Sequence, residues 1–146
     1  MAADMSREHT IEFQVRPDDI DQMGVVHHSR YLTYFDLGRE ELLRDAGLAA
    51  AANGPGAPSA PALRLAEIDV RFLAPARHGD TLRLTTAVAE LRTDEVVFKG
   101  RLIRIRPEPQ VVLAEATMVA AAIWPDGRPR PLAPHEAAAL RAAPPQ

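Results

Sequence analysis

Residues 30–46 carry the pattern that most restricts how this chain can fold. At about 100° per residue, the apolar side chains of this stretch gather on one face of a helix. That face comprises Tyr31, Tyr34, Phe35, Gly38, Leu42 and Ala46, with Leu32 and Leu43 beside them. It covers about half of the helix circumference, which is more than a helix lying on a protein surface needs. The pattern therefore predicts a long helix that other elements wrap.

Both ends of this predicted helix carry suitable residues. Ser29 is the expected N-cap, and Gly47 stands where a left-handed residue ends a helix. Arg39 falls within the apolar face, where a charge requires a partner. Asp36 lies at the border of that face, so we expect the two side chains to form a structural ion pair.

Alternating apolar residues predict five strands. In residues 10–16, Ile11, Phe13 and Val15 share one face. The same reasoning predicts strands at 63–73, 81–91, 95–106 and 111–124. Apolar side chains on both faces of 111–124 indicate a central strand or one packed against a second subunit. Short connections favour antiparallel neighbours, so the predicted fold class is α+β, with an antiparallel sheet curled around one long helix.

The rest of the chain fits a single domain spanning residues 1–146. Residues 53–61 contain three prolines and two glycines, which predicts a connection inside this domain. The tail from 133 to 143 is expected to form a short helix. No apolar run approaches the roughly 20 residues of a membrane span, and the first ten residues lack a signal-peptide core. We therefore expect a cytoplasmic protein without membrane insertion.

Composition excludes several classes of site. The chain has no cysteine, which rules out disulfides, thiolate zinc sites and cysteine nucleophiles. A net charge of −3 gives no general reason to bind nucleic acid, and none is expected as a partner. The adjacent His27 and His28 have no further ligand cluster near them, so no metal site is expected. We expect no cofactor either.

Asp21 is the candidate carboxylate of a catalytic site. It lies three residues before Gly24 and shortly before the predicted helix. A carboxylate can act as a general base or a nucleophile when donors for a developing negative charge lie nearby. The unpaired N–H groups at a helix N-terminus suit an oxyanion. Local chemistry alone nevertheless favours a solvated turn or capping aspartate at this position.

The wider sequence favours the catalytic interpretation. The segment 19–31 (Asp-Ile-Asp-Gln-Met-Gly-Val-Val-His-His-Ser-Arg-Tyr), followed by Tyr-Phe-Asp-Leu-Gly-Arg at 34–39, resembles the 4-hydroxybenzoyl-CoA thioesterase family. It is most similar to the branch associated with the Tol-Pal system. The match continues through 70–72, 75–76 and 79–80 and so covers most of the chain.

The resemblance implies a hotdog fold with active sites at a dimer interface. It also implies that Asp21 attacks the thioester carbonyl or activates water, and that a backbone N–H near His28 polarises that carbonyl. Gly24, Val26, His28 and Tyr31 are the positions implied for substrate binding or the oxyanion. The His28 side chain orients water or assists proton transfer, or else packs on the sheet where the helix begins. Asp19 is expected to be an exposed turn residue, in preference to a support for the site.

The function implied is hydrolysis of a small or medium acyl-CoA to a carboxylic acid and free CoA. The expected partners are the acyl-CoA substrate and further copies of the chain in a homodimer or homotetramer. Two alternatives stay open: hydrolysis of acyl groups on an acyl carrier protein, and non-catalytic binding of acyl-CoA. A covalent acyl-Asp21 intermediate and general-base catalysis are both compatible with the sequence. The cations that could bind the CoA phosphates are Arg71, Arg77, Lys99, Arg101, Arg104 and Arg106.

Overall fold

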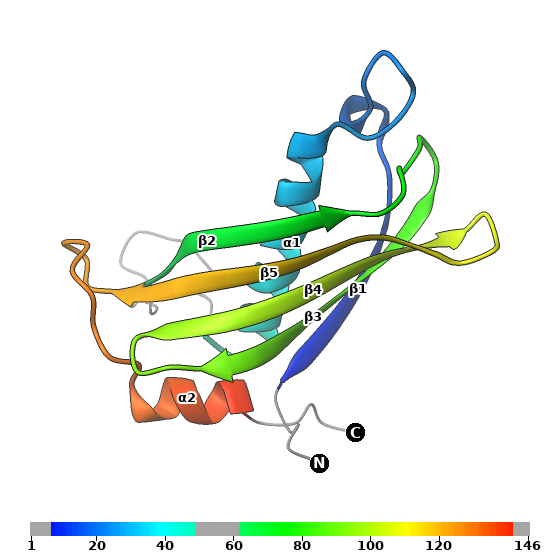
Figure 1. The fold of residues 1–146 in the computed structure, drawn as a ribbon. Coiled ribbons are helices and arrows are strands. Elements are labelled where there is room, and N and C mark those ends of the chain that lie inside the picture. Colours follow the sequence, from blue (N-terminus) through cyan, green and yellow to red (C-terminus); the bar gives the residue numbers. More distant parts are fainter. Residues whose placement is uncertain (1–6, 49–61, 142–146) are drawn as a thin grey trace.

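The computed structural model describes residues 7–48 and 62–141, and its centre is one helix wrapped by one sheet. Helix α1 spans His28–Asp45, and five antiparallel strands curl around it (Figure 1). The strands are β1 Glu8–Gln14, β2 Ala62–Phe72, β3 Thr81–Leu91, β4 Glu95–Arg106 and β5 Val111–Ile123. A short 3-10 turn, Pro17–Asp19, precedes α1, and helix α2, Pro134–Arg141, follows the sheet. The predicted α+β hotdog arrangement is confirmed.

The strand order in the sheet is β1-β3-β4-β5-β2. Strand β5 therefore lies inside the sheet, as the apolar residues on both of its faces predicted. Strand β2 pairs with β5 and not with β3, although β3 follows it in the chain. The segment 73–80 consequently crosses the end of the sheet, from the β2 edge to the β3 side.

Helix α1 approaches β3 and β4 closely at two glycines. A Cβ atom on Gly38 would lie 2.5 Å from Oγ1 of Thr86, and one on Gly100 would lie 2.7 Å from the Phe35 ring. Phe35 is fully buried in this crossing, and so is Leu84 beside Gly38. Such contacts leave no space for a side chain, so the two glycines set how near the helix lies to the sheet.

The ends of α1 differ partly from the expectation. The helix begins at His28, and its N-cap is His27, whose Nδ1 accepts the Ser29 N–H at 3.2 Å. The prediction of Ser29 as N-cap is therefore wrong, because the backbone is extended up to His27 and is already helical from His28 onward. Gly47 has φ of 77° and is the expected left-handed residue after the helix. Arg39 lies 3.0 Å from Asp36, which confirms the predicted ion pair.

The strand boundaries agree closely with the sequence patterns. Strands β3 and β4 have the predicted bounds, and β5 ends one residue early. The first strand ends at Gln14 and not at residue 16, because the chain turns into the 3-10 segment at Pro17. The predicted connection 53–61 lies outside the described residues.

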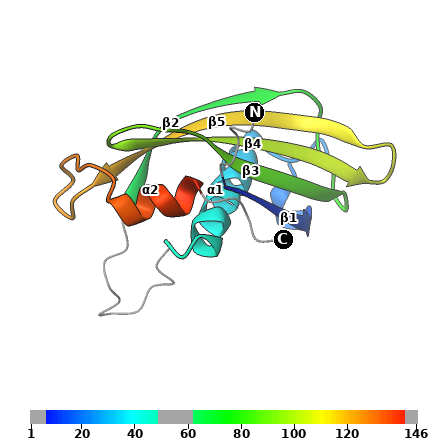
Figure 2. The same cartoon turned by 90° about the horizontal axis from the view of Figure 1, so that it is seen from below.

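Helix α2 lies on the same side of the sheet as α1 (Figure 2). A buried ion pair holds the segment that leads into it: Arg130 donates to both carboxylate oxygens of Glu136, at 2.8 and 3.0 Å. The Ala133 N–H also donates to Glu136, at 2.7 Å. Burial raises the pKa of the Glu136 carboxyl, but the bonds from Arg130 and Ala133 outweigh burial and leave the pKa below its usual value. Within the described ranges 7–48 and 62–141, neither helix is long and apolar enough to cross a membrane.

We predict that Glu136→Gln lowers the free energy of unfolding by about 3 kcal/mol at neutral pH, because it breaks a buried charge pair. Since the folded-state pKa of Glu136 is lowered, the pair stabilises the protein above the unfolded pKa of about 4.3 and loses its effect as pH falls through the lower folded value. Urea unfolding from pH 7 to pH 3 should show the difference between the two proteins shrinking in acid. A difference that does not change with pH would contradict this role.

We also predict that Gly100→Ala lowers the free energy of unfolding by about 1 to 3 kcal/mol, because the added methyl group overlaps the Phe35 ring. Denaturant unfolding measures this difference. A matched test combines Gly100→Ala with Phe35→Leu, which replaces the ring by a smaller side chain, so the double variant should lose less than the sum of the two single losses. Additive losses would show that the loss at Gly100 does not come from close packing against Phe35.

Candidate active site

Residues 19–27 form a small hairpin that carries Asp21. Its two arms are joined by backbone bonds from Asp21 N to Val25 O, at 2.8 Å, and from His27 N to Asp19 O, at 3.0 Å. Gly24, at the tip, has φ of 81°, a left-handed conformation that glycine adopts without strain. The second arm leads directly into α1, so the hairpin places Asp21 beside the start of the helix.

One oxygen of the Asp21 carboxylate is fixed by the hairpin itself. Oδ1 accepts the Met23 N–H at 2.8 Å and the Val25 N–H at 3.3 Å. Within residues 7–48 and 62–141, no hydrogen bond to Oδ2 is formed. The carboxylate is thus oriented through one oxygen while the other is available to a reactant.

A pocket of about 290 Å³ lies against Asp21. It is lined by Asp21, Val25, Val26, His28, Tyr31, Phe72, Leu73, Ala74 and Pro75. Its surface is largely apolar, and the Phe72 ring centre lies 5.0 Å from that of His28 and 5.2 Å from that of Tyr31. Phe72 and Leu73 remain about half exposed at its rim. An apolar acyl group fits the character of these walls.

The start of α1 presents a backbone donor to this pocket. The Ser29 N–H is bonded to His27, and the Arg30 N–H to the His27 carbonyl at 2.9 Å. The His28 N–H, at the first helical position, has no carbonyl partner in the helix. His28 lines the same pocket as Asp21, so the residue that carries this donor is part of the pocket wall.

Tyr31 connects the pocket to the segment that crosses the sheet end. Its hydroxyl accepts the Ala76 N–H at 3.0 Å, and the Val26 N–H donates to the Ala76 carbonyl at 2.8 Å. Burial, with a further contribution from Asp80, raises the pKa of the Tyr31 phenol despite the Ala76 bond, so it stays neutral. Tyr31 is therefore both a core residue and a wall of the pocket.

Asp19 is not the exposed turn residue that we expected. Its side chain is 13% exposed, and Oδ2 accepts the Tyr34 hydroxyl at 2.9 Å and the Arg16 N–H at 3.1 Å. The guanidinium of Arg30 lies 3.6 Å from its other oxygen. The expectation failed because Tyr34, whose hydroxyl bonds to Asp19, lies on α1, fifteen positions further along the chain.

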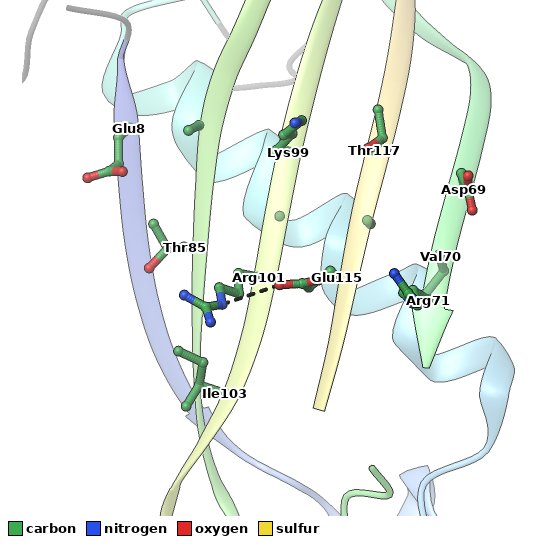
Figure 3. A pocket seen from close by; sticks show the side chains of 13 residues that line it. Glu8, Asp69, Val70, Arg71, Thr85, Lys99, Arg101, Ile103, Glu115 and Thr117 are labelled. Carbon is green, nitrogen blue, oxygen red and sulfur yellow. Dashed lines mark ion pairs between the residues drawn. The ribbon is translucent and has the colours of Figure 1, made fainter. Parts of the chain in front are cut away.

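A larger hollow, of about 860 Å³, lies on the opposite face of the sheet from α1 (Figure 3). It contains Arg71, Lys99 and Arg101, three of the cations considered for the CoA phosphates. Arg101 and Glu115 pair across β4 and β5 at 3.5 Å. The hollow contains the carboxylates of Glu8, Asp69 and Glu115, but neither Asp21 nor the N-terminus of α1 lines it, so it lacks the unpaired helix N–H groups that suit an oxyanion.

The structure brings Asp21, Val26, His28 and Tyr31 together around one pocket, whereas Gly24 shapes the turn and is not part of the lining. Sequence reasoning missed the run Phe-Leu-Ala-Pro at 72–75, which supplies the facing wall. Its signals were an apolar run at the end of a predicted strand and the family resemblance through 70–72 and 75–76. Residues 7–48 and 62–141 contain no group of three or more His, Asp or Glu side chains that could hold a metal.

Comparison with known proteins gives a consistent family. Residues 15–140 match the sequence pattern of the thioesterase-like superfamily. The acyl-CoA thioesterase YbgC of Haemophilus influenzae is 30% identical over 106 residues, 73% of this chain and 74% of that protein. The chloroplastic acyl-acyl carrier protein thioesterase ATL3 of Arabidopsis thaliana is 28% identical over 128 residues, 88% of this chain. The chain spans 64% of the length of ATL3.

The fold has close counterparts among solved structures. The 4-hydroxybenzoyl-CoA thioesterase of Pseudomonas sp. strain CBS-3 superposes with a TM-score of 0.74 at 19% identity, covering 87% of this chain and 93% of that one. This likeness concerns the fold, and the family follows from the sequence match. On that evidence, the chain belongs to the thioesterase-like superfamily.

Proposed function

We propose that this protein hydrolyses the thioester of a small or medium acyl-CoA to a carboxylic acid and free CoA. The observation that carries the proposal is the Asp21 carboxylate, oriented through Oδ1 and open at Oδ2, in an apolar pocket at the start of α1. The names of relatives such as the Haemophilus YbgC support the same reaction class. We propose that the site is of the 4-hydroxybenzoyl-CoA thioesterase type and, more specifically, that the protein belongs to the Tol-Pal-associated branch.

The chemistry needs few groups. As a general base, Asp21 takes a proton from a water molecule while the water oxygen bonds to the thioester carbonyl carbon. The carbonyl oxygen gains negative charge, and the His28 N–H donates to it at the helix N-terminus. When the oxyanion collapses, the carbon–sulfur bond breaks and the CoA thiolate receives the proton from Asp21.

The covalent variant uses the same atoms. Oδ2 of Asp21 bonds to the carbonyl carbon and the thiolate leaves, which gives a mixed anhydride that water then hydrolyses. In both variants the apolar walls formed by Tyr31 and Phe72 hold the acyl group. The His28 ring packs against Phe72 at the rim, where it helps to orient the attacking water.

We further propose that a second copy of the chain completes the site. Strand β2 lies at the edge of the sheet, so the backbone groups along its outer side have no strand partner within the described chain. At the end of this strand, Phe72 and Leu73 are 45% and 49% exposed, and Met23, in the hairpin that carries Asp21, is 81% exposed. Apolar side chains grouped at an unpaired edge favour a homodimer, with a homotetramer as a further step of assembly.

An acyl carrier protein is a second candidate carrier of the acyl group. The observation that favours it is the 28% identity to ATL3, named as an acyl-acyl carrier protein thioesterase. Both carriers present the acyl group as a thioester at the end of a flexible arm, so the same carboxylate and helix N-terminus would act on it. Comparing one acyl group on the two carriers distinguishes these possibilities.

We predict that Asp21→Asn and Asp21→Ala lower kcat at least about 100-fold, because each removes the base or nucleophile. The measurement is thiol release from a panel of aliphatic and aromatic acyl-CoAs. The matched control is Asp18→Asn, which neutralises an exposed carboxylate in the adjoining 3-10 turn and should keep nearly full activity. Full activity in both Asp21 variants would eliminate the proposed mechanism, and a wild-type protein that binds acyl-CoA without turnover would indicate a binding function.

We also predict that the protein sediments as a multiple of its 15.9 kDa chain mass. Because a second copy is expected to complete the pocket, activity per chain should fall when dilution dissociates the dimer. Analytical ultracentrifugation and thiol release over the same concentration range measure both effects. A monomer with full activity per chain would contradict the shared site.

A further inference from the structure

We propose that Asp19 and Tyr34 are positioning residues, which fix the Asp21 hairpin to α1 and so keep the Asp21 carboxylate beside the His28 N–H. This inference rests on the proposed thioesterase function. It assigns a catalytic consequence to two residues that do not line the pocket.

Within the described residues, the Asp19 side chain connects the hairpin to the elements around it. Its Oδ2 accepts the Tyr34 hydroxyl at 2.9 Å and the Arg16 N–H at 3.1 Å, while Oδ1 lies 3.6 Å from Nε of Arg30. Tyr34 is 6% exposed, and its ring lies 4.8 Å from that of Phe13 on β1. The Tyr34 hydroxyl is therefore a hydrogen-bond donor held in a fixed position, on the buried side of the second turn of α1.

The contact is transmitted to Asp21 through the backbone. The Asp19 carbonyl accepts the His27 N–H at 3.0 Å, and the Asp21 N–H donates to the Val25 carbonyl at 2.8 Å. Ile20, between the two aspartates, is bridged to Val26. Moving Asp19 would therefore move the arm that carries Asp21.

The two arms of the hairpin are held in different ways. The second arm runs into α1 and also bonds to the sheet-crossing segment, through Val26 N to Ala76 O at 2.8 Å. The first arm reaches α1 through the Asp19 side chain, with a longer bond of 3.5 Å from Arg30 to the Asp18 carbonyl. Losing the Asp19–Tyr34 bond would thus loosen mainly the arm with the carboxylate, which would still be bonded to the second arm, and leave the oxyanion donor in place.

Losing this contact is expected to misalign the Asp21 carboxylate with the His28 N–H more than it weakens substrate binding. The carboxylate and the His28 N–H act on the same carbonyl group, and a misplacement of about 1 Å can cost roughly 100-fold in rate. The acyl pocket is formed mostly by other side chains, so substrate affinity should change little. Burial and the bond to Asp19 raise the pKa of the Tyr34 phenol, which keeps the donor protonated at neutral pH.

The test uses Asp19→Asn, Tyr34→Phe and the double variant in the full chain, with the acyl-CoA that wild type hydrolyses fastest. Tyr34→Phe deletes one oxygen and keeps the ring in the core, so it guards against simple misfolding. Each single variant should lower kcat about tenfold with KM unchanged within about twofold. The double variant should lose less than the two single losses combined, because Asp19→Asn weakens the same contact that Tyr34→Phe removes. Asp126→Asn, which also removes a carboxylate bonded to an arginine and a backbone N–H, is the control and should keep wild-type kcat.

A second readout does not depend on activity. Amide hydrogen exchange at Asp21 and His27 should accelerate at least about tenfold in Asp19→Asn and Tyr34→Phe, while exchange at Val88, bonded to Arg7 O in the sheet, stays unchanged. Unchanged exchange in the hairpin, unchanged kcat, or a fall in kcat that matches a fall in folded protein would each overturn the positioning role. If wild type cleaves no thioester, the proposed function fails, and hairpin exchange alone decides whether the anchor exists.

Discussion

The close crossing of α1 over β3 and β4 is the contact on which the rest of the structure depends. Gly38 lies against Thr86, and Gly100 lies against the Phe35 ring, so the helix cannot come closer to the sheet, or turn a larger side chain toward it, without a clash. Because the crossing is fixed in the middle of the helix, its N-terminus is fixed as well. That end lies beside the end of β2 and the segment that crosses the sheet, where Ala76 bonds to Tyr31 and Val26.

The proposed reactive site at this place agrees with simple electrostatics. A helix N-terminus offers unpaired N–H groups and a partial positive charge. The hairpin before α1 uses two of its own N–H groups to hold one oxygen of Asp21, and the apolar end of β2 supplies one wall of the pocket. A carboxylate, an N–H donor and an apolar pocket thus meet without a metal ligand set in the described residues 7–48 and 62–141. These are the elements that thioester hydrolysis requires.

The sequence predicted the helices and strands more accurately than it predicted which of them lie side by side. Periodicity gave the bounds of β3 and β4 and the buried face of α1, because both depend on residues close in the chain. It could not give the pairing of β2 with β5, which depends on a crossing at the sheet end, and so the wall at 72–75 was missed. The burial of Asp19 was missed for the same reason, since its partner Tyr34 lies fifteen positions further along the chain, beyond the hairpin. Asp21, His28 and Tyr31 were proposed through the family resemblance, which carries long-range information that local chemistry lacks, and they line one pocket.

The central claim is that Asp21 and the His28 N–H act on one thioester carbonyl. A crystal structure with an acyl-CoA analogue whose thioester is replaced by a non-hydrolysable ketone tests it most directly. The account predicts a carbonyl oxygen about 3 Å from the His28 nitrogen and a carbonyl carbon within about 3.5 Å of Oδ2 of Asp21, or separated from it by one water. An analogue bound with its carbonyl in the hollow on the outer face of the sheet, among Arg71, Lys99 and Arg101, would contradict it.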